Sequence, residues 1–524
     1  MRSLLAALLL MALGGKDAAF ADALQHSLLT YHADSARSGN FIVPSLSFDQ
    51  ARALHLDKAF HAELSGQIYA QPLYWYDTRS NSGKLLVATE SNEVYALDAK
   101  TGQEIWHKPL AKPVPLSSLP CGNIDPMGIT GTPVIDESTA SIFLDTLVEG
   151  SLGVRHLIFG LSLEDGSVLP GWPIDVAAAL SSKGLTFNPA IQGQRGALTI
   201  VDGTLFVPFG GLFGDCGDYH GWVIGVPLRD PQNLTSWATR ARGGGIWAPG
   251  GISTDGSSLY AATGNTFDTA IWRDGEAVFR LPFGLQRDDQ TQNYFAPWDW
   301  QELDRRDADL GGTNPLPLDA PAGSGTQAFL LALGKDGRAY LLDRNNLGGL
   351  GGSLVTEFIS THSIRTSPAT WLGSDAVFVA LQGEGAACPS FFDRLGFIGR
   401  WLMRSKDLRI FKLVRRLLGI DDPALTVLRV RSGSPPAIET AWCAAFRGGG
   451  SPIVTTADGR SNPIVWVTGA EGDNLLHGYR GDSGEELFAG GGIRMPGLHH
   501  FQALIATEDR LYVGADGRLF AFAF

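Results

Sequence analysis

The feature that most constrains the fold is a phrase that recurs eight times: a segment containing Pro or Gly, then β-rich stretches separated by polar turns. The eight copies begin at residues 71, 130, 188, 247, 311, 365, 450 and 501. All but one of the steps between them are 51 to 64 residues long, which suits a four-stranded sheet with long connections. The repeat predicts an all-β fold, an eight-bladed β-propeller of four-stranded antiparallel blades. Two stacked β-sandwiches are the alternative, and eight recurrences argue against them.

The composition agrees with short strands joined by tight turns. Glycine and proline supply 65 and 28 of the 524 residues, too many for a helical bundle, and 44% of the chain is hydrophobic, too much for disorder. The formal net charge is −13, so we expect no nucleic-acid partner bound non-specifically over the surface.

The last repeat has room for only three strands before Phe524. Residues near Leu56 to Leu64 precede the first repeat, and we expect them to supply the missing outer strand. Pairing the two ends of the chain in one blade closes the ring and leaves no large open sheet edge. We therefore predict a single propeller domain over residues 22–524.

Residues 1–21 have the pattern of a secretory signal peptide. Arg2 is followed by the apolar run Leu4 to Leu13, and Ala19-Phe20-Ala21 offers the small-x-small pattern of a cleavage site. The apolar run is too short to span a bilayer comfortably, although an uncleaved anchor is the alternative. We expect an exported protein, periplasmic or extracellular.

Export makes disulfides an expectation, because oxidising compartments preserve them. The chain has four cysteines, which permit three pairings. In one of them Cys388 and Cys443 clip the base of an insertion, and Cys121 and Cys216 join neighbouring repeats. Four free buried thiols are the alternative.

The insertion occupies residues 391–420, inside the one long step of 85 residues between repeats. It breaks the β pattern and carries eight Lys or Arg against two Asp, with apolar residues at helical spacing. We predict a basic amphipathic helix pair in the sixth blade. It either caps the propeller or docks a partner, or it makes peripheral contact with an anionic membrane.

One repeat carries a motif of a known family. Residues Ala96 to Trp106 read A-L-D-A-K-T-G-Q-E-I-W, which resembles the A-x-D-x-x-T-G-x-x-x-W motif of the PQQ-binding-like β-propeller superfamily, the fold of quinoprotein alcohol dehydrogenases. The resemblance spans roughly the whole chain after the leader. It implies a tight turn from Asp98 to Gly102 and a Trp106 that wedges between blades. No Cys-x-x-Cys-His run is present, so we expect a subgroup that lacks the c-type haem domain.

Three further segments resemble cofactor-contact motifs of that family. Gly334 to Arg344 is similar to the segment whose Lys or Arg contacts the quinone oxygens, which assigns that role to Lys335. Trp247 matches the floor under the cofactor ring, and Asn265 of T-G-N matches a metal ligand. The resemblance thus implies PQQ and a divalent cation, Ca²⁺ or similar, as cofactors.

Carboxylates and arginines complete the candidate set. The segment before the fifth repeat makes Asp307 or Asp309 the base that takes a substrate proton, with the other near the metal; the alternative is that both cap a turn at Gly311-Gly312. Arg195 and Arg365 lie at the starts of repeats, where they bind an anionic group or neutralise an acidic face. We place Arg365 among the cofactor-binding residues.

Two departures from the family pattern bear on function. The adjacent Cys-Cys pair is here Cys121-Gly122, and the metal-binding Glu is absent, so that Asp215 or Asp218 would have to substitute with a shorter reach. We carry Asp215 as the candidate ligand. Two functions remain open: a quinoprotein-type oxidoreductase acting on an alcohol or sugar hydroxyl of a small-molecule substrate, and a non-catalytic propeller scaffold that binds a protein or envelope partner.

Overall fold

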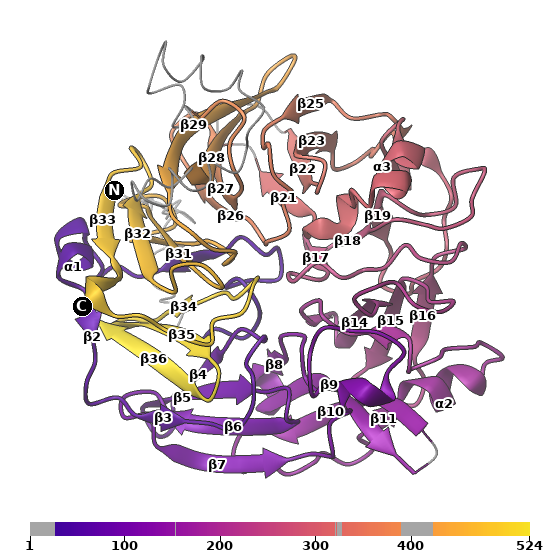
Figure 1. The fold of residues 1–524 in the computed structure, drawn as a ribbon, viewed down its shortest axis with the longest axis horizontal. Helices are drawn as coiled ribbons and strands as arrows, with labels where there is room; N and C mark the ends of the chain where they lie inside the picture. Colours follow the sequence, from indigo (N-terminus) through magenta and orange to yellow (C-terminus); the bar gives the residue numbers. More distant parts are fainter. Residues whose placement is uncertain (1–26, 152, 320, 322–326, 389–422) are drawn as a thin grey trace, which may run out of the picture.

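Eight separate sheets stand side by side around one axis (Figure 1). The computed structural model of the protein describes residues 27–151, 153–319, 321, 327–388 and 423–524. The prediction of an all-β, eight-bladed propeller is confirmed. The predicted leader at 1–21 and the basic helical insertion at 391–420 lie outside the described residues, so both stay predictions.

Each blade is one antiparallel sheet, and its strands follow one another along the chain. The first blade contains β4 (Leu73–Asp77), β5 (Ser82–Ala88), β6 (Glu93–Asp98) and β7 (Glu104–Pro109), and the second contains β8 (Val134–Asp136), β9 (Ser141–Gly150), β10 (Gly153–Ser162) and β11 (Ile174–Asp175). The third contains β12 (Gln192–Gly193), β13 (Thr199–Val201), β14 (Thr204–Gly211), β15 (Trp222–Pro227) and β16 (Thr235–Ala238). The fourth contains β17 (Ser253–Thr254), β18 (Leu259–Thr263), β19 (Ala277–Leu281) and β20 (Tyr294–Ala296).

The fifth blade contains β21 (Leu316–Asp319), β22 (Ala328–Leu333), β23 (Arg338–Asp343) and β25 (Val355–Phe358), and the sixth contains β26 (Ala369–Leu372), β27 (Val377–Gln382), β28 (Pro423–Arg431) and β29 (Ala437–Ala445). The seventh contains β30 (Ile453–Thr456), β31 (Ile464–Thr468), β32 (Leu476–Arg480) and β33 (Glu486–Ala489). The eighth contains β34 (Ile505–Ala506), β35 (Arg510–Ala515) and β36 (Arg518–Ala523). Two short strands, β1 (Asn40–Ile42) and β24 (Gly349–Leu350), add to blades seven and four in parallel. The described helices are α1 (Phe48–Ala53), α2 (Val176–Ser181) and α3 (Trp300–Arg306), with 3₁₀ turns at η1 (Leu116–Ser118), η2 (Glu137–Thr139), η3 (Thr291–Asn293), η4 (Leu310–Gly312) and η5 (Gly490–Gly492).

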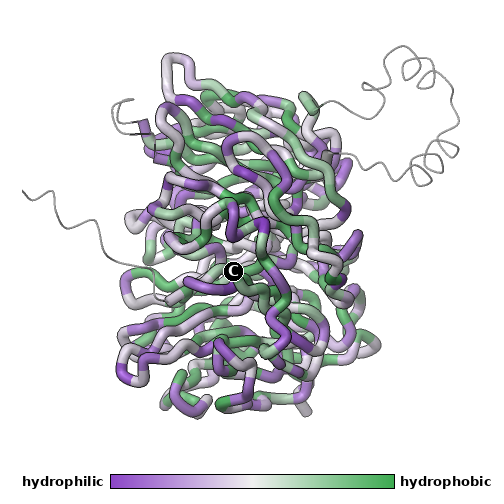
Figure 2. The backbone as a smooth tube through the Cα atoms, turned by 90° about the vertical axis from the view of Figure 1, so that its left-hand side faces the viewer, coloured by the Kyte–Doolittle hydropathy of each residue, from purple (hydrophilic) through white to green (hydrophobic). Residues whose placement is uncertain are grey.

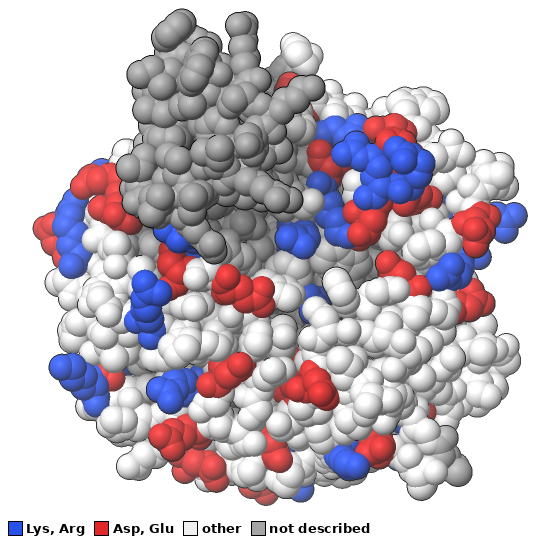
Figure 3. Space-filling view, viewed as in Figure 1, with Lys and Arg blue, Asp and Glu red and all other residues white. Residues whose placement is uncertain are grey.

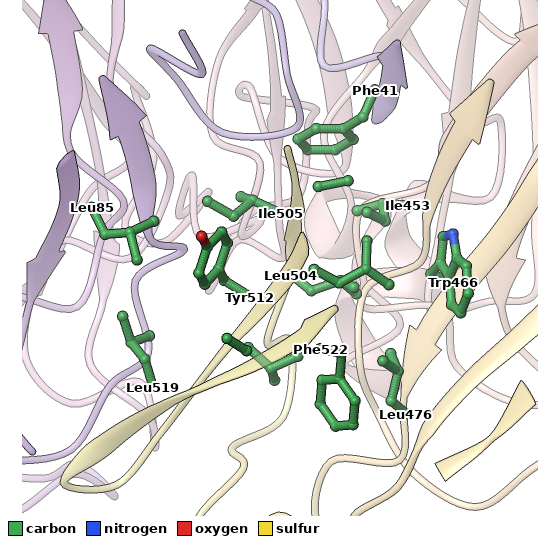
Figure 4. Close-up of a cluster of buried hydrophobic side chains, with 14 of the residues drawn as sticks. Phe41, Leu85, Ile453, Trp466, Leu476, Leu504, Ile505, Tyr512, Leu519 and Phe522 are labelled. Atoms are coloured by element: carbon green, nitrogen blue, oxygen red, sulfur yellow. The ribbon is translucent and has the colours of Figure 1, made fainter. Parts of the chain in front are cut away.

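The ends of the chain meet in the eighth blade, as predicted. β2 (His55–Leu56) and β3 (Ala62–Glu63) both pair antiparallel with β36, so the leading segment supplies the outer edge of the last sheet. A large apolar cluster fills the joint (Figure 4) and includes Phe41 of β1, Leu85 of the first blade, Trp466 of the seventh and Phe522 of the eighth. Burial of each such side chain contributes about 1.5–3 kcal/mol, so the joint is held by packing as well as by strand pairing.

The family-like motif locks two blades together. The Asp98 carboxylate accepts hydrogen bonds from the backbone N–H groups of Lys100 and Thr101, which fixes the turn after β6. The Trp106 indole then donates to the carbonyl of Leu163 at 3.1 Å and packs against Gly166 of the second blade. A Cβ on Gly166 would lie 2.8 Å from the Trp106 ring, so glycine is required beneath the indole. The predicted wedge of Trp106 between blades is confirmed.

Two disulfides join Cys121 to Cys216 and Cys388 to Cys443, spanning 95 and 55 residues. The alternative of four free thiols is therefore wrong.

In side view, hydrophobic and hydrophilic residues are interleaved over the height of the ring (Figure 2). In the part of the chain that the structure describes, no helix has the length and apolar character needed to cross a membrane.

Candidate functional site

A cavity of about 1000 Å³ lies where the blades converge. Its lining comes from most of the ring, because the segment that opens each of blades two to eight contributes at least one residue. All seven candidate site residues line it: Asp215, Trp247, Asn265, Asp307, Asp309, Lys335 and Arg365. Figure 3 shows one face of the ring, on which acidic and basic side chains are interspersed and several Lys and Arg side chains lie toward the centre.

Three of these residues form one contact cluster. The Trp247 indole Nε1 donates a 2.9 Å hydrogen bond to Oδ2 of Asp309, and the Lys335 ammonium lies 2.8 Å from the same oxygen. Lys335 Nζ is also 5.0 Å from the centroid of the Trp247 ring, within cation–π range. The aromatic ring, the carboxylate and the ammonium therefore fix one another's positions.

The backbone after α3 presents the two aspartates. α3 ends at Arg306. The next residue, Asp307, adopts the left-handed conformation (φ +50°), and its carboxylate pairs with Lys335 Nζ at 2.9 Å. Asp309 follows, and its carbonyl accepts a hydrogen bond from the backbone N–H of Lys335. The Asp309 side chain makes no capping bond to η4. The alternative that both carboxylates merely cap a turn at Gly311-Gly312 is therefore wrong for Asp309.

The T-G-N segment forms the other wall of this cluster. The backbone N–H of Asn265 donates to Oδ1 of Asp309 at 3.1 Å, so the Asp309 carboxylate contacts three segments of the chain, those of Trp247, Asn265 and Lys335. Gly264 packs directly against the cluster: a Cβ there would lie 3.1 Å from Cγ of Asp309 and 3.2 Å from Nε1 of Trp247. Any larger residue at 264 would push the carboxylate and the indole apart.

Burial dominates the electrostatics of the cluster. The Asp309 side chain is only 4% exposed, and burial raises its pKa although the Lys335 ammonium limits the rise. Burial alone would lower the pKa of Lys335, but the Asp309 and Asp307 carboxylates outweigh it and raise that pKa. Lys335 is therefore charged at neutral pH. Asp307, whose side chain is 65% exposed, is the accessible carboxylate of the pair.

Sequence reasoning missed two carboxyl groups behind the cluster. Glu276 is fully buried, accepts the backbone N–H of Leu310 at 2.6 Å, and has a pKa raised well above its usual value by burial and by Asp309. Burial likewise raises the pKa of Asp304 to about 6. Glu276 belongs to no motif that the resemblance supplied, and only the fold brings it near Asp309. Asp304 stands in the segment before the fifth repeat that carries Asp307 and Asp309, but the resemblance gave it no role.

Asp215 and Arg365 line the cavity without joining this cluster. The Asp215 carboxylate accepts a 2.6 Å hydrogen bond from the Tyr219 hydroxyl, and burial and this carboxylate together raise the pKa of Tyr219. Sequence reasoning also missed Phe501, whose ring centroid lies 6.3 Å from that of Trp247. Its position at the start of the last repeat was the available signal, because repeat starts point to the axis.

The described residues suit a flat anionic quinone better than a divalent cation. Trp247 offers an aromatic face in the cavity, and Lys335 and Arg365 offer cations for carbonyl and carboxylate oxygens. A cation near Asp309 would have to compete with the Lys335 ammonium and with two N–H donors. Within the described part of the chain, no three His, Cys, Asp or Glu side chains are grouped so as to hold a metal ion. The residues present therefore do not fit the implied calcium site.

The comparisons with known proteins identify the fold. No protein-family model matches the sequence, and no curated protein matches it either. Among solved structures, the quinohemoprotein alcohol dehydrogenase of Comamonas testosteroni is similar over 96% of this chain and 81% of its own, with a TM-score of 0.61 and 14% identity. A quinohemoprotein alcohol dehydrogenase of Pseudomonas putida HK5 is similar over 95% of this chain and 80% of its own, with a TM-score of 0.62 and 11% identity. A europium-containing methanol dehydrogenase is similar over 95% of this chain and 98% of its own, with a TM-score of 0.61 and 13% identity. This chain thus has an eight-bladed β-propeller fold similar to that of these quinohemoprotein alcohol dehydrogenases and of the methanol dehydrogenase.

Proposed function

We propose that the protein is an exported oxidoreductase of the quinoprotein type, which oxidises an alcohol or sugar hydroxyl in the central cavity. The observation that carries the proposal is the contact of Trp247, Asp309 and Lys335, because it combines an aromatic face, a fixed cation and carboxylates in one cavity. The likeness to a quinohemoprotein alcohol dehydrogenase and a methanol dehydrogenase supports it. The two disulfides support export.

Each residue of the cluster has a separate task in this proposal. Trp247 is the surface on which the quinone ring lies, and Lys335 holds a positive charge beside the quinone oxygens, with Arg365 facing a carboxylate of the cofactor. A quinone held there would supply the oxidising equivalent, as an acceptor for the hydride (one proton with two electrons) of the substrate carbon. Asp307 accepts the proton that leaves the substrate hydroxyl, because it is the accessible carboxylate. Asp309 positions Trp247 and Lys335.

Titration of the purified protein with PQQ, with and without Ca²⁺, tests the proposal. We expect a perturbed quinone absorbance with saturation near one equivalent, and reduction of an electron-accepting dye when alcohols or sugars are added. Trp247→Ala should shift this titration to quinone concentrations at least tenfold higher. Trp298→Ala is the matched control, because Trp298 is 76% exposed and does not line the cavity. If Ca²⁺ changes neither signal, the cation expected from the resemblance is not needed.

The alternative function is a non-catalytic scaffold that binds a protein or envelope partner. The donor set around Asp309 favours it, because those carboxylate oxygens already have partners. If no quinone binds at saturating concentration, this alternative takes the place of the proposed oxidoreductase. Contact with a membrane through residues 391–420 would then be tested by flotation of the protein with anionic vesicles.

A further inference from the structure

Arg195 is a cation in the wall of the central cavity with no carboxylate partner. It lies at the start of the third repeat, and its guanidinium is 5.1 Å from the ring centroid of Phe501 and 6.0 Å from that of Tyr69. Among the described residues, none offers a carboxylate within 4.0 Å of it or a hydrogen-bond acceptor to it. Aromatic stacking holds the side chain in place but leaves its five N–H donors unused.

The acidic groups nearest to Arg195 are engaged elsewhere. Glu471 accepts hydrogen bonds from Nδ1 and the backbone N–H of His500 at 2.6 and 3.1 Å. Glu90 is buried outside the cavity lining, and its carboxylate accepts the backbone N–H of Gly128 at 2.7 Å. Arg365 shares the cavity, and it too has no ion pair within the described part of the chain. The cavity wall therefore carries two arginines, Arg195 and Arg365, whose charges have no ion-pair partner among the described residues.

Phe501 connects this cation to the proposed reaction site. Its ring centroid lies 5.1 Å from the Arg195 guanidinium and 6.3 Å from the Trp247 ring centroid, and all three residues line the cavity. A ligand that extends from Trp247 across Phe501 would thus meet the guanidinium. Charge-assisted, bidentate hydrogen bonds to a carboxylate are what a planar guanidinium forms best.

We propose that Arg195 binds the carboxylate of the substrate, so that the protein acts on hydroxy acids or acidic sugars in preference to neutral alcohols. This inference rests on the proposed function for the position of the reacting hydroxyl. The quinone cofactor also carries carboxylates, so Arg195 has two possible ligands. We assign the carboxylate that Arg195 binds to the substrate, and the experiment below distinguishes it from a carboxylate of the cofactor.

Calorimetric titration of the purified protein with D-glucuronate, D-gluconate and L-lactate, and with neutral D-glucose, provides the measurement. At least one of the three carboxylates should bind, with glucose at least tenfold weaker. Arg195→Gln should weaken the binding of that carboxylate by about tenfold to a hundredfold, and Arg195→Lys should weaken it by less. Arg460→Gln is the matched control, because Arg460 is an exposed arginine that does not line the cavity. A thermal melt of each variant shows that it is folded.

The outcomes separate the two proposals. If PQQ binding is unchanged in Arg195→Gln while carboxylate binding is lost, the cation serves the substrate. If PQQ binding falls and carboxylate binding does not, the guanidinium serves the cofactor and the inference is overturned, although the oxidoreductase stands. Absence of carboxylate binding to the unmodified protein also overturns it. If PQQ fails to bind at all but a carboxylate binds through Arg195, the anion site stands without the oxidoreductase.

Discussion

The Trp247 indole and the Asp309 carboxylate, 62 residues apart in sequence, are joined by a 2.9 Å hydrogen bond inside the central cavity. The bond connects the start of the fourth repeat to the start of the fifth. Asp309 is nearly inaccessible to solvent, so its oxygens depend on protein donors, and Trp247 supplies one of them. The orientation of the aromatic face and the charge of the carboxylate are therefore set by the same contact.

Replacing Trp247 with phenylalanine tests this dependence. Phenylalanine keeps an aromatic face but removes the N–H donor, so we expect PQQ to bind about threefold to tenfold more weakly. Trp247→Ala removes the stacking surface as well, and we expect a loss of at least tenfold to a hundredfold. Absorbance titration of the quinone gives both dissociation constants. Equal losses in the two variants would show that the hydrogen bond, and not the ring, holds the cofactor.

The Lys335–Asp309 pair should contribute to stability mainly because neither charge can be left alone. Lys335→Met removes the cation and leaves Asp309 nearly buried without it, so the free energy of unfolding should fall by about 3 kcal/mol. Adding Asp309→Asn to that variant removes the unpaired charge and should restore at least 1 kcal/mol. Urea unfolding measures all three proteins.

Arg305→Met is the control for that series, because it breaks an exposed pair with Glu302. Its cost should be much smaller than that of Lys335→Met, because water screens the charges of an exposed pair. If the double variant is no more stable than Lys335→Met, the pair does not act as an electrostatic unit.

Because of Glu90, the free energy of unfolding should fall between pH 5 and pH 8. Its carboxyl group is fully buried, and burial raises its pKa to about 7. A carboxyl group whose pKa is higher in the folded than in the unfolded protein binds its proton more tightly when folded, so the folded state loses stability as pH rises from about 4.5 to 7. Over pH 5 to 8 this amounts to about 2–3 kcal/mol.

Glu90→Gln should remove that part of the pH dependence. The variant's free energy of unfolding, relative to the unmodified protein, should rise by about 2–3 kcal/mol between pH 5 and pH 8. Glu508→Gln, at an exposed position, should leave the pH profile unchanged. Parallel profiles for Glu90→Gln and the unmodified protein would contradict the assignment.

The repeat made the ring predictable, but not the chemistry at its centre. Each repeat start recurs at a regular step, so the blades and the closure by β2 and β3 could be predicted from spacing alone. The motifs located Trp247 and Lys335, and the fold brings both to one cavity. Glu276 escaped prediction because a buried carboxyl group has no local signature; it is defined by which blades converge around it. Phe501 could have been found from its position at the start of the last repeat.

The Cys121–Cys216 disulfide, at the rim of the cavity, should contribute more to the free energy of unfolding than the Cys388–Cys443 disulfide does. Its flanking residues Gly122 and Asp215 line the cavity, and it closes a loop of 95 residues. Replacing both cysteines with alanine should lower the free energy of unfolding by about 4–5 kcal/mol, and slightly less for Cys388 and Cys443, which close a shorter loop. Denaturation of the two double variants under non-reducing conditions measures the difference. A greater loss in the second variant would contradict the loop-length argument.

Arg37 holds the leading segment across the ring and should be the costliest single residue to remove. Its side chain is fully buried and donates to the carbonyls of Leu198, Gly250 and Ile252, at 2.9, 2.9 and 3.2 Å, and to the hydroxyls of Thr30 and Thr199. The segment around it also pairs with the first and seventh blades. Arg37→Met would leave several buried acceptors unpaired at about 1–3 kcal/mol each, so we expect a loss above 4 kcal/mol in urea unfolding. Arg37→Lys keeps the charge but has fewer hydrogen-bond donors, so its free energy of unfolding should lie between those of Arg37→Met and the unmodified protein. Arg52→Met, which breaks only exposed pairs with Asp49 and Glu485, should cost less than about 1 kcal/mol. Equal costs at positions 37 and 52 would mean that the segment is held by its strand pairing alone.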